Sequence, residues 1–145
     1  MTNRSNKINQ KRLTIGAFFM LAAVAYLSQQ IPQNSHSKLV DLYTNKQSGQ
    51  MLEVAGKVLK ILSDDNQGSR HQRFIIKSNN LTVLIAHNID LAQKIPVDIG
   101  DQVLVYGQYE WNNQGGVIHW THYDPQGKHE GGWIKHEKKV YGKTF

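Results

Sequence analysis

The sequence predicts an all-β fold, a small five-stranded antiparallel barrel preceded by a short N-terminal helix. Two observations support this prediction. Five segments show the apolar–polar alternation of strands, and most are separated by short stretches rich in Asn, Asp, Ser and Gly, which favour turns. The chain has 145 residues, which suits one domain of ordinary size. It has no cysteine, which excludes disulfides, thiolate metal sites and thiol nucleophiles.

Residues 1–31 are expected to be a signal peptide or a membrane anchor. Residues 1–12 contain four basic residues and no acidic residue, and residues 13–27 (LTIGAFFMLAAVAYL) are uncharged and mostly apolar. A basic segment before an apolar one is typical of an export signal, and the small residues at 23–25 offer a cleavage site. Without cleavage, the segment would anchor the chain with its basic end in the cytoplasm. We therefore expect a protein that is secreted to the periplasm or anchored in the inner membrane.

Residues 32–50 are expected to form a polar linker and a short helix. Four apolar residues are spaced to share one helix face, namely Leu39, Val40, Leu42 and Tyr43. The polar residues at 47–49 would end this helix. Residues 51–145 would then contain the barrel and a basic C-terminal tail.

Five strands are expected after this helix, at residues 53–62, 71–77, 81–86, 102–111 and 117–123. A hairpin turn would join the last two, and a longer connection the third and fourth. Gly56 and Gly107 lie inside strands, where glycine lets a strand bend sharply. This pattern resembles that of OB-fold barrels, and a five-stranded SH3-like barrel is the alternative.

The C-terminal tail, residues 135–145, contains few apolar residues. We expect it to be a solvated extension or to rest on an anionic membrane surface.

The formal charge of +6 is concentrated at the two ends of the chain. Residues 1–12 carry +4 and residues 128–145 carry +3, whereas residues 29–127 carry −1. A nucleic-acid groove needs an excess of positive charge. A nucleic-acid partner is therefore possible but not favoured.

Histidines and other polar residues gather around the last predicted hairpin and in two earlier segments. The sequence strings concerned are HQRF at 71–74, AHNIDLA at 86–92, YEWN at 109–112, and GGVIHWTH followed by DP at 115–125. Together they resemble a family of short bacterial proteins known as domain of unknown function 3465, which is recognised by its HWTH motif. The resemblance covers most of the chain after the leader, from Gly56 to Tyr141. It implies that residues 119–122 are the signature of the family, and it implies no activity.

Metal binding is one hypothesis for these histidines, since imidazole and carboxylate groups bind zinc and other divalent cations without cysteine. The candidate ligands are His119, His122, Asp124 and His129. Side chains three positions apart point to opposite faces of a strand, so His119 and His122 would meet only at a bulge or a strand end. Alternatively, one of them binds together with His71 or His87, or each is simply a half-buried histidine with hydrogen bonds in the sheet.

A metal-dependent hydrolase, such as a phosphodiesterase or a nuclease, is the alternative function. The candidate catalytic residues are His71, His87 and His119, one of which would act as general base. Arg70 and Arg73 could hold a phosphate. Residues 64–70 (DDNQGSR) are equally typical of a solvated turn.

The preferred hypothesis is a cell-envelope binding domain with a polar, histidine-rich site on the last hairpin. OB-fold barrels bind extended ligands by aromatic stacking on an open sheet face. The candidate ligand-binding residues are Arg73, Asn88, Trp111, Asn112, Trp120, Thr121 and Tyr123. Aromatic rings beside Asn and His without net charge suit a small ligand such as a sugar or a peptide. The aromatic residues could also be only the core and rim of the barrel.

Overall fold

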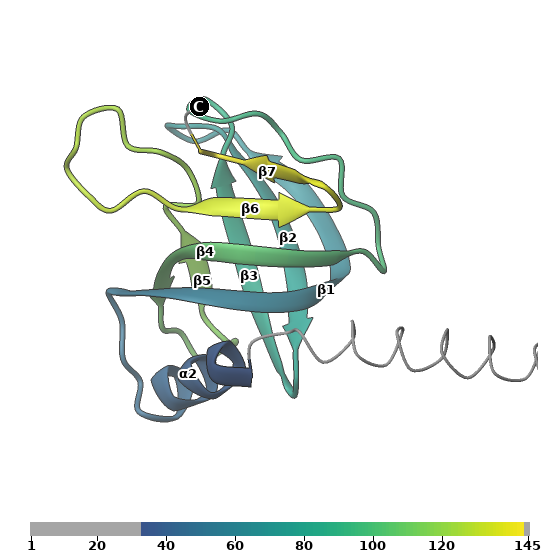
Figure 1. The fold of residues 1–145 in the computed structure, drawn as a ribbon, viewed down its shortest axis with the longest axis vertical. Coiled ribbons are helices and arrows are strands. Elements are labelled where there is room, and N and C mark those ends of the chain that lie inside the picture. Colours follow the sequence, from purple (N-terminus) through teal and green to yellow (C-terminus); the bar gives the residue numbers. More distant parts are fainter. Residues whose placement is uncertain (1–32, 144–145) are drawn as a thin grey trace, which may run out of the picture. The chain divides into compact units, whose positions relative to one another are not determined.

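The computed structural model describes residues 33–143. The predicted signal or anchor of residues 1–31 lies outside the described residues. The elements are α2 (Gln33–Thr44), β1 (Gln50–Asp65), β2 (His71–Ser78), β3 (Leu81–Asn88), β4 (Gln102–Glu110), β5 (Val117–His119), β6 (Trp133–His136) and β7 (Lys139–Tyr141) (Figure 1). The predicted mostly-β fold with a short preceding helix is therefore confirmed. Between residues 33 and 143, no helix is long and apolar enough to cross a membrane.

Five of the strands are hydrogen-bonded in a closed ring. The order is β1–β2–β3–β5–β4, and β4 pairs again with β1. The pair formed by β3 and β5 is parallel, with Leu84 opposite Val117, whereas the other pairs of the ring are antiparallel. The expectation of a wholly antiparallel arrangement was therefore wrong for this pair. An odd number of strands cannot alternate in direction around a closed ring, so one pair must be parallel.

The long strand β1 contributes to the ring twice. Its first half pairs with β4 from Gln50 to Lys57, and its second half pairs with β2 from Lys57 onwards. Gly56 lies at this change of partner, and a Cβ there would lie 2.8 Å from Cδ1 of Ile76. A Cβ would also lie 3.0 Å from the Lys77 carbonyl oxygen, so glycine favours the close approach of β1 and β2 at the expected bend. Figure 1 shows β1 curving around the ring from β4 towards β2.

The last strand of the ring, β5, is shorter than the predicted range of 117–123. It ends at His119 because Trp120 adopts a left-handed backbone conformation with φ of 53°. Beyond this point the chain pairs irregularly with the C-terminal part of the molecule. The Tyr123 N–H donates to the Gly142 carbonyl, and the Gly132 N–H donates to the His122 carbonyl at 3.0 Å.

The C-terminal residues form a hairpin, so the prediction of a solvated tail at 135–145 was wrong for the described part of this range. Strand β6 pairs with β4 on the edge of the ring, and β7 pairs with β6. Ile134 is fully buried and Tyr141 is 6% exposed. These two side chains hold the hairpin on the core although most of its other residues are polar or charged.

The core fills the interior of the ring and is closed at its ends by other segments. Its largest fully buried side chains come from the strands and include Tyr109, Phe74, Ile85 and Ile118. Leu39 and Leu42 add an apolar face from α2, which lies below the ring in Figure 1. Ile95 of the connection between β3 and β4 is also buried, and the Gln72 side chain forms hydrogen bonds of 2.7 and 2.9 Å with its backbone.

Candidate functional site

The HWTH motif, residues 119–122, begins at the end of β5 and is packed closely against glycines. A Cβ at Gly107, Gly132 or Gly142 would lie between 2.3 and 2.4 Å from a backbone carbonyl oxygen of the motif. These distances are far below van der Waals contact, so any larger residue would displace the motif. Three glycines from β4 and the C-terminal region therefore determine the position of its backbone.

Thr121 and His87 form a hydrogen-bonded pair inside the protein. Both side chains have no solvent exposure, and Thr121 Oγ1 lies 2.8 Å from His87 Nδ1. His87 Nε2 lies 3.2 Å from the carbonyl oxygen of Gln93, which can only accept a hydrogen bond. Nε2 therefore carries the proton, and Nδ1 accepts the hydrogen bond of the threonine hydroxyl. Burial lowers the pKa of His87 to about 4, so the ring is neutral at neutral pH.

Asp124 organises the loop that follows the motif. Its carboxylate accepts hydrogen bonds from the backbone N–H groups of Gln126, Lys128 and His129. These bonds, first of all the one from Gln126, hold the pKa of Asp124 below its ordinary value. The carboxylate of this candidate metal ligand is thus engaged in shaping the loop.

Trp120 lies between two histidine rings on the rim of the ring of strands. Its indole stacks on His129, with ring centroids 4.1 Å apart and planes 11° apart, and the His119 ring lies 5.2 Å away on a tilted plane. A positive φ is rare for a bulky residue and requires a surrounding structure that imposes it. Within residues 33–143, the indole N–H of Trp120 has no hydrogen-bond partner. The motif therefore presents a partly exposed ring with a free donor.

His119 adds polar groups to the same rim. Its side chain is 32% exposed, and its Nε2 donates to Oε1 of Gln108 at 3.2 Å and lies 3.8 Å from Oε1 of Glu110. Burial lowers the pKa of His119, while Glu110 acts in the opposite direction. The side chains of Gln108, Glu110 and His119 lie on the outward face of the β4–β5 pair, where Gln108 is opposite His119.

The two arginines considered for phosphate binding, and the candidate base His71, form contacts with other groups. Arg70 forms an ion pair of 2.7 Å with Asp90. Arg73 Nε donates to the carbonyl of Ser63 at 3.0 Å. His71, at the start of β2, donates through Nδ1 to the carbonyl of Ser69 at 2.8 Å.

Three of the candidate ligand-binding residues stabilise local structure. The Asn88 side-chain oxygen accepts from the backbone N–H groups of residues 90 and 91. The Asn112 side-chain oxygen does the same for residues 114 and 116 in the hairpin turn. Trp111 packs against the core and donates from Nε1 to the carbonyl of Tyr43 in α2 at 3.1 Å. By contrast, Tyr123, another of the candidates, is 47% exposed.

Two of the candidate metal ligands lie close together, since Nε2 of His129 is 3.9 Å from Oδ2 of Asp124. His122 is 5% exposed and donates through Nδ1 to the carbonyl of Tyr123 at 2.7 Å. Its ring meets that of His129 edge-on, with centroids 5.6 Å apart. The part of the chain that the structure describes contains no group of three or more His, Asp or Glu side chains arranged to hold a metal ion.

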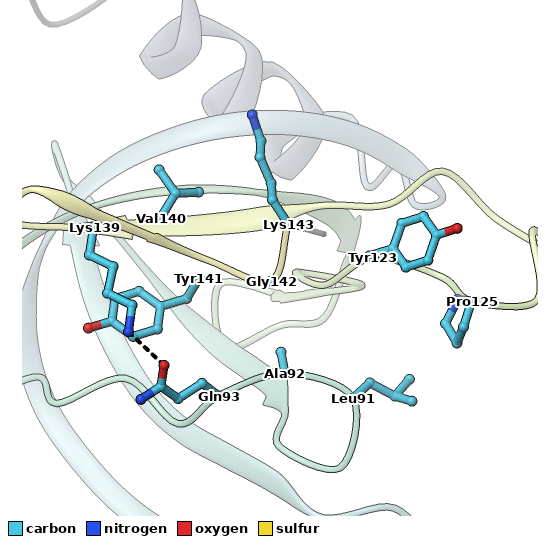
Figure 2. A pocket seen from close by; sticks show the side chains of 10 residues that line it. All are labelled: Leu91, Ala92, Gln93, Tyr123, Pro125, Lys139, Val140, Tyr141, Gly142 and Lys143. Carbon is cyan, nitrogen blue, oxygen red and sulfur yellow. Dashed lines mark hydrogen bonds between the residues drawn. The ribbon is translucent and has the colours of Figure 1, made fainter. Parts of the chain in front are cut away.

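A cavity of about 410 Å³ lies near Tyr123, between the connection after β3 and the C-terminal hairpin (Figure 2). Its lining includes Leu91, Gln93, Lys139 and Tyr141. None of these four is among the candidate site residues predicted from the sequence. Lys139 and Tyr141 belong to β7, whose three residues are too few to show the alternation of a strand.

Comparisons with known proteins agree with the resemblance carried by the HWTH motif. A family model described as "Protein of unknown function (DUF3465)" matches residues 20–142. This range includes every helix and strand of the described structure, and it contains the whole motif. A comparison with curated proteins gave no match.

Proposed function

The chain belongs to the DUF3465 family, and from its geometry we propose that it is an OB-like binding domain of the cell envelope whose ligand is a sugar. The ligand site is the rim formed by Trp120, His119 and the polar side chains of Gln108 and Glu110. The leader predicted from residues 1–31 supports the location in the envelope.

The five-strand ring supports the OB-like part of the proposal. Its first strand pairs with both β2 and β4, and the strand order β1–β2–β3–β5–β4 returns to β1, as expected of a small five-stranded barrel. We propose the outward face of β4 and β5, where the side chains of Gln108, Glu110 and His119 lie, as the ligand-binding face.

The main support for the proposal is Trp120, whose backbone φ is positive and whose indole N–H has no hydrogen-bond partner within residues 33–143. Backbone strain of this kind is found at ligand clamps, where the surrounding structure holds a side chain in a useful position. Here the strained residue presents an aromatic ring with an unpaired N–H donor, next to the exposed parts of His119 and Glu110. An aromatic ring beside both donors and acceptors matches the hydroxyl groups and apolar ring face of a sugar.

The hydrolase alternative has less support. His87, one of its candidate bases, is buried with both ring nitrogens hydrogen-bonded. Arg70 is paired with Asp90, and a carboxylate lies beside His119 where a phosphate would need positive charge.

The proposal is tested by titrating the full chain with N-acetylglucosamine, glucose and maltose while recording amide NMR spectra. We expect saturable shifts at residues 108, 110, 119 and 120 with at least one of the sugars. Trp120→Ala should weaken that binding about tenfold or more, whereas Trp133→Ala, which removes a different partly buried indole, should leave it within twofold. Absence of shifts at these positions with all three sugars would overturn the proposal.

A further inference from the structure

The cavity between the connection after β3 and the C-terminal hairpin, called the groove below, is lined mostly by apolar side chains. Leu91 is 50% exposed and lines it together with Pro125, Val140 and the ring of Tyr123. Figure 2 shows Leu91, Tyr123 and Pro125 gathered at one end. Its volume of about 410 Å³ lies within the range of small-molecule sites, about 300–1,000 Å³.

The other end of the groove is polar and positively charged. Lys139 Nζ donates to Oε1 of Gln93 at 2.6 Å and lies 4.7 Å from the centre of the Tyr141 ring. Figure 2 shows these three side chains together at that end. The ammonium group has two further N–H donors, and the Gln93 amide nitrogen has two as well. Several N–H donors therefore lie at this end of the groove, and Lys139 supplies its positive charge.

Lys139 has no negatively charged partner. Within residues 33–143 it forms no ion pair, and the residues that line the groove include no Asp or Glu. The second lysine of the lining, Lys143, has its ammonium group 5.0 Å from the centre of the Trp133 ring. In Figure 2 it points away from Gln93 and Leu91, so Lys139 provides the positive charge within the groove.

We propose that this groove is a second binding site, for a small organic acid with an apolar body. The carboxylate accepts charge-assisted hydrogen bonds from Lys139 Nζ and from the Gln93 amide, and the apolar body packs against Leu91, Pro125 and Tyr123. Charge complementarity selects the anion, since Lys139, a lysine without a carboxylate partner, lines a groove whose other walls are mostly apolar. The site is distinct from the sugar rim, because its residues come from the connection after β3, the C-terminal hairpin and the loop after the motif, and none of them belongs to the rim.

The test uses a pair of probes that differ only in charge. Amide NMR spectra of the ¹⁵N-labelled full chain are recorded during titration with 4-phenylbutyrate and, separately, with its neutral analogue 4-phenylbutyramide. We expect saturable shifts centred on the amides of Ala92, Val140 and Gly142, with the acid binding about tenfold more tightly than the amide.

Two matched lysine variants then locate the charge. Lys139→Gln should lower the affinity for the acid to that for the amide. Lys143→Gln, which removes the same charge from the same lining, should leave it within twofold. Leu91→Ser should weaken both probes equally, and because Leu91 is half exposed this variant should fold normally.

Three outcomes would overturn the proposal. In the first, neither probe shifts the amides of the groove. In the second, acid and amide bind equally, or the two lysine variants have the same effect. In the third, shifts arise only with phosphatidylglycerol vesicles and not with the soluble acid, which would identify a membrane-surface patch.

Discussion

Thr121 Oγ1 donates a hydrogen bond of 2.8 Å to Nδ1 of His87, and both side chains are completely buried. The third residue of the HWTH motif is thus an internal structural residue, whereas the second, Trp120, is on the rim. One short motif therefore supplies both an anchor in the core and the exposed groups of the proposed site.

Thr121→Val should destabilise the protein by about 1–3 kcal/mol. Valine has nearly the same shape, but it leaves Nδ1 of His87 buried without a donor. Urea unfolding monitored by circular dichroism would measure the difference. Thr121→Ser is the control, since it retains the hydroxyl and loses only a methyl group, and it should be less destabilising. Equal effects of both substitutions would contradict a role of the hydrogen bond.

His87 should make the stability depend on pH between about 4 and 6.5. Its folded-state pKa of about 4 lies below its unfolded value of 6.5, so the unfolded chain binds the proton more readily. The stability associated with the neutral ring is present above pH 6.5 and is lost as the pH falls towards 4, by up to about 3 kcal/mol.

This pH dependence is measured by urea unfolding of the wild type and His87→Gln at pH 7 and pH 4.5. The decrease between the two pH values should be smaller in the variant. His71→Gln is a suitable control because His71 is only partly buried at the start of β2. If His87→Gln and the wild type lose equal stability, the buried ring does not titrate as described.

Gly132→Ala should destabilise the protein by about 3 kcal/mol, at the upper end of overpacking effects. The new Cβ would lie 2.2 Å from the Tyr106 carbonyl oxygen and 2.3 Å from that of Trp120. Gly127→Ala is the control, since no atom lies within 4 Å of its Cβ position, and its φ of 63° should cost only about 1–2 kcal/mol. The measurement is thermal unfolding, and a milder effect at Gly132 than at Gly127 would contradict the close packing of the motif.

Trp120→Gly should separate binding from stability. Glycine adopts a positive φ without strain, which should stabilise the protein by about 1–2 kcal/mol. It also removes the stacking of the indole on His129, which should destabilise the protein by about the same amount. We expect unfolding free energies within about 1 kcal/mol of the wild type and complete loss of the sugar-induced amide shifts. Trp120→Phe, which keeps a ring and lacks the N–H, should retain part of the binding. A variant that lacks the indole yet binds normally would show that the ring does not contact the ligand.

Ile134→Ala should destabilise the protein by about 2–5 kcal/mol, because it removes a fully buried side chain from β6. Lys135→Ala, at the neighbouring exposed position, should change the stability by less than about 0.5 kcal/mol. Both values come from urea unfolding. A negligible effect at Ile134 would mean that the C-terminal hairpin does not belong to the core.

Much of the fold follows from the hydrophobic periodicity of the sequence. The strands β1 to β4 are long and alternate clearly, and Gly56 lies where one of them changes partner. The hairpin of β6 and β7 could not be predicted in this way because its strands have four and three residues. Ile134 is the only aliphatic residue of β6, so no alternation is visible.

The site was harder to predict because one histidine, His87, is a buried structural residue whereas another, His119, is partly exposed, so the residue type alone does not show its role. His87 continues the inward alternation of Val83 and Ile85, so periodicity alone is sufficient to place it inside β3. The strand end at Trp120 has no such signal, since its left-handed conformation is imposed by packing against glycines that are distant in sequence. The cavity beside Lys139 depends on tertiary contacts between segments 46 residues apart.

The parallel pair that closes the ring is also its shortest junction, with only two residue pairs in register, Leu84–Val117 and Ile85–Ile118. A sheet separates most easily where the fewest backbone hydrogen bonds hold neighbouring strands. The Thr121–His87 bond joins the same two segments just beyond the last of these pairs. The motif therefore adds a buried side-chain hydrogen bond to a junction with little backbone pairing, and we expect amide hydrogen exchange in β5 to depend on this bond.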